Sequence, residues 1–335
     1  MGTLKTKIRK KLFSVMSDKT IDRFYRVYYR VRYPKEMQKK CSFGSHNPDK
    51  TFYVIRPRTD CTEGLMSLFM NVAKNMHFAY EHNYEPIIDF ENYQTQYIDN
   101  SRSEKNVWEY YFTQPTKYTL KEIYQSKNVI LSGLNIQWYK PALYEVNFSD
   151  DILRQLHDDI FTKIKFSNDV MRATKEEISK IGLNLTKTLA LYLRGTDYIK
   201  LKPSGHPVQP TVEQAVEVVE KYLNQYDIEK IFLITEDGEI YEKIKSKYGD
   251  KCVITSSDTF IKNYDGKDYI SHHQSINDLG NSPYQRGLNY LIKLIILSEC
   301  EYFIGGNTMG SWAACAFAEQ PFKAKYVFDL GMYGK

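Results

Sequence analysis

The segment Thr188-Leu189-Ala190-Leu191-Tyr192-Leu193-Arg194-Gly195-Thr196-Asp197 decides the fold of this chain, because a short apolar run ends there directly in a charged cluster. Three further apolar runs in the second half end in the same way, and helical patterns separate them: Lys230 to Ile234, Cys252 to Ile254 and Tyr302 to Ile304. Strands that alternate with helices predict a parallel sheet. The carboxyl ends of such strands line one ligand crevice.

The clusters that follow the four runs bring together an arginine, carboxylates, hydroxyls and glycine amides. They are Arg194 to Asp197, Thr235 to Gly238, Thr255 to Asp258 and Gly305 to Thr308. A guanidinium can bind two phosphate oxygens with its planar fork, and amides at a helix start can bind another. The sequence therefore predicts a site for a phosphorylated ligand.

The first half has the start of a βαβ unit. Phe52 to Ile55 reads as a strand, Gly64 to Asn83 as an amphipathic helix, Pro86 to Phe90 as a second strand and Val129 to Leu131 as a third. Asp151 to Ile181 is helical and charged in pattern and is expected to connect the halves. We expect an arm at 1–40, an α/β domain at 41–180 and a second α/β domain at 181–335.

Five cysteines occur without CxxC or Cys/His spacing: Cys41, Cys61, Cys252, Cys300 and Cys315. The sequence has no signal-peptide pattern and no apolar run of about 18 residues. These features predict a cytoplasmic protein with neither structural disulfides nor a zinc site.

The positive charge is concentrated in residues 1–40. Thirteen Lys or Arg stand there against three acidic residues, which is +10, so the whole-chain charge of +5 leaves −5 for residues 41–335. Apolar residues recur at helical spacing between the charges: Leu4, Ile8, Leu12, Val15, Met16, Phe24, Val27, Tyr28 and Val31. This pattern is typical of helices at an anionic membrane surface. Packing of the arm on the protein's own domains is the alternative, and no motif for nucleic acid accompanies the charge.

Several site residues allow a purely structural interpretation as well. Arg194 could form an ion pair with Asp197, and Thr308, like Ser311, could simply cap a helix. Glu236 or Asp237 could bind a ribose or base edge, or could cap the next helix.

The ordered motifs resemble a known superfamily. Tyr192 to Asp197 is similar to the His-x-Arg-x-x-Asp segment of the GDP-fucose-dependent fucosyltransferases, which include α-1,6, α-1,2 and protein O-fucosyltransferases. Further similar segments follow the family's order over roughly residues 51–320: Glu63 to Leu65, Pro86 to Asp89, Phe232 to Asp237, Leu297 to Ile304 and Gly306 to Thr308. A bacterial glycosyltransferase branch is the expected placement.

The resemblance implies two Rossmann-like domains facing a cleft, the GT-B architecture, and a metal-independent, inverting transfer from GDP-fucose. By position, Arg194 would hold the β-phosphate, Asp197 would orient its loop, Glu236 and Asp237 would contact guanosine, and Thr308 would reach the diphosphate. The expected donor site is completed by Tyr192, Ser256, Asn307 and Gly64. A glycan or lipid-linked acceptor in surface polysaccharide synthesis is the expected partner, and no cofactor is expected.

Two departures from the family pattern affect these expectations. The motif histidine is Tyr192, which leaves the preference for guanine open. The carboxylate that core enzymes carry five residues after the motif Asp corresponds to Lys202, a poor base at neutral pH. His206, in a loop with three prolines, is the candidate base, although it could be an ordinary turn residue. Asp60 and Glu63 are further candidates.

Two other functions remain open at this point. One is a glycosyltransferase that uses a different nucleotide sugar, and the other is a non-catalytic nucleotide-sugar or glycan-binding module of the same fold. A binding module would be free to lose the phosphate arginine and the loops of the second domain, which are present here.

Overall fold

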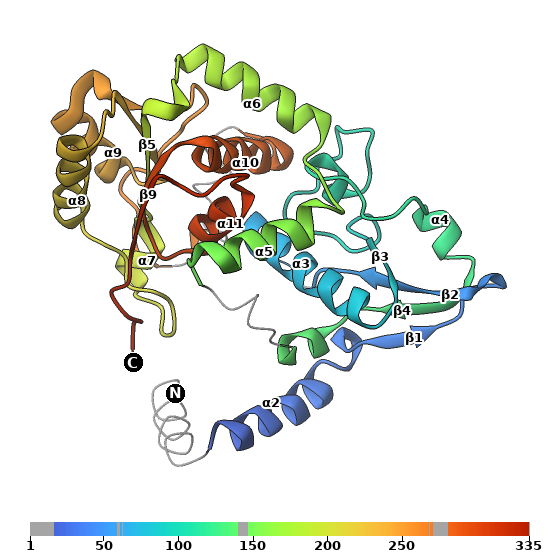
Figure 1. Cartoon of the computed structure of the whole chain (residues 1–335). Helices are drawn as coiled ribbons and strands as arrows, with labels where there is room; N and C mark the ends of the chain where they lie inside the picture. Colours follow the sequence, from blue (N-terminus) through green and yellow to red (C-terminus); the bar gives the residue numbers. More distant parts are fainter. Residues whose placement is uncertain are drawn as a thin grey trace.

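The computed structural model describes residues 17–58, 61, 63–139, 147–267, 269–270 and 281–334. Two sheets, each flanked by helices, lie side by side along the molecule (Figure 1). The first part of the basic arm, Leu4 to Met16, and the base candidate Asp60 lie outside the described residues.

The second half contains a five-stranded parallel sheet. Its strands are β5 (Thr188–Tyr192), β6 (Lys230–Ile234), β7 (Cys252–Val253), β8 (Tyr302–Gly306) and β9 (Ala324–Phe328), in the order β7-β6-β5-β8-β9. The four predicted strands are confirmed, and β9 is additional. The strand order reverses between β5 and β8, which makes the gap beyond their carboxyl ends the topological switch point of the sheet.

Helices cover both faces of this sheet (Figure 1). They are α7 (Thr196–Leu201), α8 (Val212–Gln225), α9 (Gly238–Tyr248), α10 (Pro283–Glu299) and α11 (Met309–Phe317), with 3₁₀ turns at Leu185–Lys187 and Gly249–Lys251. Thr211 and Gln214 form a capping box at the start of α8. Helix α10 is buried over most of its circumference, as its apolar sequence predicts.

The first half contains a four-stranded sheet in the order β1-β4-β2-β3. Strands β2 (His46–Ile55), β3 (Glu85–Ile88) and β4 (Ser126–Leu131) are parallel, whereas β1 (Lys39–Cys41) runs antiparallel to β4. The βαβ start with α3 (Leu65–Glu81) is confirmed. Short helical segments complete this half: Pro34–Glu36, Val107–Tyr110, α4 (Leu120–Ile123) and Leu134–Trp138. Strand β2 begins earlier than predicted because its first residues are exposed and polar and carry no apolar signal.

The predicted helical connector consists of two helices. Helix α5 (Asp150–Phe161) ends before residue 162, and Ser167 then caps α6 (Asn168–Ile181) by accepting a bond from the amide of Val170. Helix α5 packs on α11 and α6 packs on α10. The connector is therefore part of the packed body.

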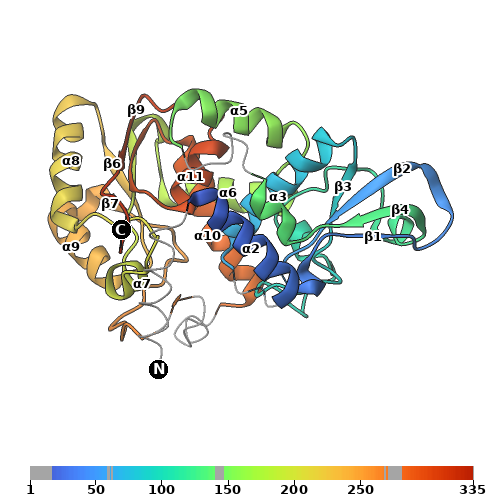
Figure 2. The ribbon, with the colours of Figure 1, turned by 90° about the horizontal axis from the view of Figure 1, so that it is seen from below.

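One hydrophobic core runs through both halves. The ring of Phe69 on α3 meets the ring of Phe317 on α11 edge to face, with 5.3 Å between the centroids. Helix α2 (Asp18–Arg32) precedes this body and lies on its underside (Figures 1 and 2). No helix in the described part of the chain is both long and apolar enough to span a bilayer.

Candidate functional site

A cavity of about 710 Å³ lies beyond the carboxyl ends of β5 and β8, with the start of α3 as its opposite wall. Seven residues that the sequence singled out line it together: Glu63, Gly64, Tyr192, Arg194, Asp197, His206 and Thr308. The cavity thus occupies the switch point of the second sheet and includes a wall from the first half. Ligands of open α/β sheets bind at such a point.

Arg194 follows β5 and is held by two carboxylates. Its Nη2 donates to Asp197 Oδ1 at 3.1 Å, and its Nε lies 3.5 Å from Glu236 Oε1. Burial disfavours its charge, yet Glu236 and Asp197 outweigh that effect and hold the pKa of Arg194 well above the usual value. Its Nε is buried and makes no hydrogen bond with the described residues, and none of their hydrogen bonds uses Nη1, so the guanidinium keeps donors for a ligand oxygen.

Asp197 contacts Arg194 and two backbone amides, and the loop-orienting role that the resemblance implied for it stays a prediction. Its side chain is 4% exposed and accepts bonds from the backbone amides of Tyr198 at 3.0 Å and Ile270 at 3.2 Å. The ion pair with Arg194, expected as the structural alternative, is therefore present. A guanidinium fixed in this way is preorganised to meet an anion.

The two acids after β6 bind protein groups. Glu236 accepts bonds from the Gly195 amide at 2.9 Å and the Thr196 hydroxyl at 2.7 Å. Asp237 caps α9 through the amide of Glu239 and also accepts a bond from the amide of Thr196. Neither acid lines the cavity. Their contacts hold the loop that carries Arg194, and the expected contact with guanosine stays a prediction.

The start of α11 forms the third side of the cavity. Thr308 caps this helix by accepting a bond from the Ser311 amide at 3.0 Å, the capping role that the sequence left open. Thr308, Met309 and Gly310 line the cavity, so the first amides of α11 lie at its wall. Helix N-termini of this kind favour anions.

A pair of tyrosines packs against the first turn of α11. The hydroxyls of Tyr192 and Tyr290 lie 3.0 Å apart, and burial raises the pKa of both. A Cβ on Gly310 would lie 2.2 Å from the Tyr290 hydroxyl and 2.7 Å from that of Tyr192. Position 310 therefore requires glycine for this close approach. Tyr192, which stands where the resembling motif has a histidine, lines the cavity together with Arg194 and Thr308.

Two predicted donor-site residues lie elsewhere. The hydroxyl of Ser256, beyond β7, donates to Glu177 and accepts from Lys180, both on α6. The backbone carbonyl of Asn307 accepts a bond from Gln209. Neither residue lines the cavity, although Asn307 directly precedes Thr308, which does.

His206 does line the cavity, and its ring meets that of Tyr198 edge to face at 5.5 Å. Its Nδ1 is buried and bonds to none of the described residues. The loop that carries it is anchored by backbone bonds with Tyr333. An imidazole with a vacant nitrogen at a cavity wall can accept a proton. Lys202, by contrast, is exposed and lies outside this wall.

We expect His206→Ala to lower turnover about 100-fold or more while leaving nucleotide affinity nearly unchanged, because a base acts on the acceptor and not on the diphosphate. Steady-state kinetics over a pH series, with GDP binding by calorimetry, measure both. His82→Ala, which changes a histidine outside the cavity, is the matched control. Unchanged turnover across the pH range would make His206 a turn residue only.

Two cavity arginines were not identified from the sequence. Arg58 comes from the loop after β2, and Arg286 comes from the first turn of α10, where its Nη2 donates to the Gln96 carbonyl at 3.5 Å. Together with Arg194 they give the cavity lining three guanidinium groups, compared with two carboxylates, those of Glu63 and Asp197. The wall is thus suited to an anionic ligand. The position of Arg286 at the start of a helix was a signal in the sequence that could have identified it as a cavity residue. No local feature of the sequence distinguished Arg58 from other surface arginines.

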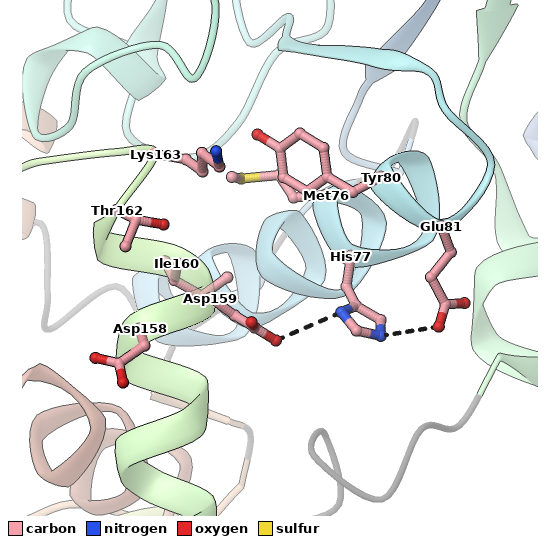
Figure 3. A pocket seen from close by; sticks show the side chains of 9 residues that line it. All are labelled: Met76, His77, Tyr80, Glu81, Asp158, Asp159, Ile160, Thr162 and Lys163. Atoms are coloured by element: carbon pink, nitrogen blue, oxygen red, sulfur yellow. Dashed lines mark ion pairs between the residues drawn. The ribbon is translucent and has the colours of Figure 1, made fainter.

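A second cavity, of about 480 Å³, lies between the other end of α3 and α5 (Figure 3). His77 sits there between two carboxylates, with Nε2 at 3.4 Å from Glu81 and Nδ1 at 3.6 Å from Asp159. Its lining contains neither an arginine nor a helix N-terminus, and acids predominate. Of the two cavities, the one at Arg194 is suited to a phosphorylated ligand.

Comparison with known families found no match, and none was found among curated proteins. Solved structures do resemble the chain. NodZ α-1,6-fucosyltransferase soaked with GDP-fucose shares 13% identity over 85% of this chain and 98% of that chain, with a TM-score of 0.47. POFUT1 in complex with GDP-fucose is 9% identical in sequence, and the match covers 84% of this chain and 99% of that chain with a TM-score of 0.47. A mutant of Arabidopsis thaliana FUT1 in complex with GDP is 10% identical in sequence, and the match covers 85% of this chain and 72% of that chain with a TM-score of 0.45.

Proposed function

We propose that the protein is a metal-independent, inverting glycosyltransferase that moves a sugar from GDP-fucose, or a related nucleotide sugar, to a glycan or glycolipid acceptor. One observation carries this proposal: Arg194 and the first turn of α11 meet at the switch point of the second sheet, in a cavity closed by the start of α3. We further propose that residues 181–335 bind the donor and residues 41–180 the acceptor, in surface polysaccharide synthesis.

Negative charge develops on the diphosphate as its bond to the sugar breaks. In the proposed reaction Arg194 Nη1 and the amides at Met309 and Gly310 meet that charge, which is the task a bound cation performs in other transferases. Asp197 keeps the guanidinium in place and so reduces reorganisation during the reaction. Arg286, on the same wall, adds positive charge.

The acceptor hydroxyl attacks the anomeric carbon from the face opposite the diphosphate. A new bond to the acceptor oxygen forms, the bond to the β-phosphate oxygen breaks, and the nucleoside diphosphate leaves with the bonding electrons. The hydroxyl proton passes to a base at the wall, for which His206 is our first candidate and Glu63 our second. The configuration of the sugar carbon is inverted by this single displacement.

We expect GDP, without divalent metal, to raise the melting temperature more than UDP, dTDP or CMP. At about 100 times its Kd, a ligand that binds only the native state adds about 2.7 kcal/mol. Thermal-shift curves with Mg²⁺ or with EDTA test the donor class and the metal requirement together. Stronger stabilisation by UDP, or loss of the GDP shift in EDTA, would contradict the proposal.

A transfer assay separates an enzyme from a binding module. Release of GDP from GDP-fucose that depends on an added glycan or glycolipid acceptor is the expected result. If the protein binds GDP-fucose but releases no GDP with any of the acceptors tested, the non-catalytic alternative would be favoured. We also propose that the protein works in the cytoplasm at the inner face of the plasma membrane, to which the basic residues 1–40 attract it.

A further inference from the structure

Helix α2 (Asp18–Arg32) exposes an apolar stripe along one side. Its residues are Phe24, Val27, Tyr28 and Val31, which are 49%, 62%, 43% and 78% exposed. They stand at positions i, i+3, i+4 and i+7, so their side chains lie on one face of the helix. Such exposure of four large apolar side chains in a row is typical of a surface that binds a partner.

Exposed arginines flank this stripe on both sides. At 100° per residue, Arg23 and Arg30 fall on one edge of the stripe and Arg32 falls on the other. The methylene groups of such arginines can lie along an apolar surface while their guanidinium groups reach outward to phosphates. A stripe bordered in this way matches the interfacial region of a bilayer, where acyl chains lie below the headgroup phosphates.

Charge discriminates between the possible occupants of the stripe. Helix α2 carries five Lys or Arg and two Asp, which is a net charge of +3. Residues 1–16 carry five Lys or Arg and no acid, which is +5. A second copy of α2 and the chain's own first residues are therefore both cations, and an anionic surface is the complementary partner.

A cation–π contact and two hydrogen bonds attach α2 and the segment after it to the first half of the chain. The Arg26 guanidinium lies 5.2 Å from the ring centroid of Trp138. Arg56 donates through Nη2 to the carbonyls of Lys35 and Met37, at 3.2 and 3.3 Å, in the segment that follows α2. The chain then continues from Arg56 to Arg58, which lines the cavity. Helix α2 is thus joined to the half of the chain that contributes Arg58 and the start of α3 to the cavity.

We propose that the apolar stripe of α2 inserts into the headgroup region of an anionic membrane and holds the cavity close to an acceptor carried by a lipid. This inference rests on the proposed function only for the identity of the acceptor. The membrane contact itself is independent of sugar transfer. Figures 1 and 2 show α2 on the underside of the molecule.

The test is sedimentation of the full-length protein with vesicles of phosphatidylcholine alone or with 30% phosphatidylglycerol. We expect binding to the anionic vesicles only. Val27→Ser/Val31→Ser keeps every charge and should weaken binding about tenfold, because the apolar area available for insertion falls. Arg23→Gln/Arg30→Gln should weaken it about fivefold per charge at low salt. Leu330→Ser, at an apolar site that is 39% exposed and outside α2, is the matched control and should bind normally.

GDP-induced thermal shifts should be equal in all these variants, because none of the substituted residues lines the cavity. This readout separates failure of the membrane inference from failure of the proposed function. Equal vesicle binding by the serine pair and the parent would overturn the inference. So would a monomer–dimer equilibrium in ultracentrifugation that the serine pair abolishes, since α2 would then be a contact between copies.

Discussion

Arg194→Lys is expected to lose nearly as much activity as Arg194→Ala. One ammonium group cannot reproduce a two-pronged contact with both Asp197 and a phosphate oxygen. Losing a charge-assisted contact to the leaving group should cost about 2–4 kcal/mol of transition-state stabilisation, or roughly 30- to 1000-fold in kcat/KM. Steady-state rates of GDP release measure this loss.

The lysine variant also separates chemistry from stability. Removal of the guanidinium leaves the nearly buried Asp197 beside Glu236 without a cation, so the alanine variant should be less stable as well. Lysine keeps a positive charge near both acids and is expected to fold. Arg172→Lys, on α6 with a side chain that is 69% exposed, is the matched control and should keep full activity. Full turnover in a folded Arg194→Ala protein would exclude the proposed role.

Phe69→Ala is expected to lower the free energy of unfolding by about 3–5 kcal/mol, because it opens a cavity in the core shared by the two halves. The Phe69 ring is 1% exposed and meets Phe112 and Phe317 at 5.3 Å, and Phe161 at 6.1 Å. Urea denaturation monitored by circular dichroism gives the difference at an unchanged m-value.

Phe43→Ala provides the control for this substitution. Phe43 is 43% exposed, so its removal should cost less than about 1 kcal/mol. If Phe69→Ala lost no more than the control, the rings around Phe69 would not form a core joining α3 to α11. A parent protein whose halves unfolded in separate transitions would contradict the shared core in a second way.

Local sequence was sufficient for four of the five strands of the second sheet. Strands β5, β6 and β8 are buried throughout or nearly so, and such strands appear in the sequence as short uninterrupted apolar runs. The polar cluster after each run then has to lie at the carboxyl edge of the sheet. Arg194 and Thr308 could be placed at one site for this reason. Strand β9 was missed because its residues are mostly half-exposed and Lys325 interrupts its apolar run.

The contacts of individual side chains could not be predicted from the sequence pattern. An aspartate that follows a strand and precedes a helix, as Asp237 does, can either bind a ribose or cap the helix. Only the tertiary structure shows that Asp237 caps α9 and accepts a hydrogen bond from the amide of Thr196. Ser256 follows a strand just as Arg194 does. Strand β7 lies two strands from β5, about 10 Å away, so the end of β7 is distant from the switch point.

The sequence by itself determined the α/β class, the parallel strands, the basic arm and the place of Arg194, because each depends on residues close together in the chain. The tertiary structure decided which distant residues complete the cavity. Arg58 and Arg286 stand 228 positions apart in the numbering and meet there because the two halves share one core. Contacts at that separation depend on how helices pack, and no local periodicity encodes them.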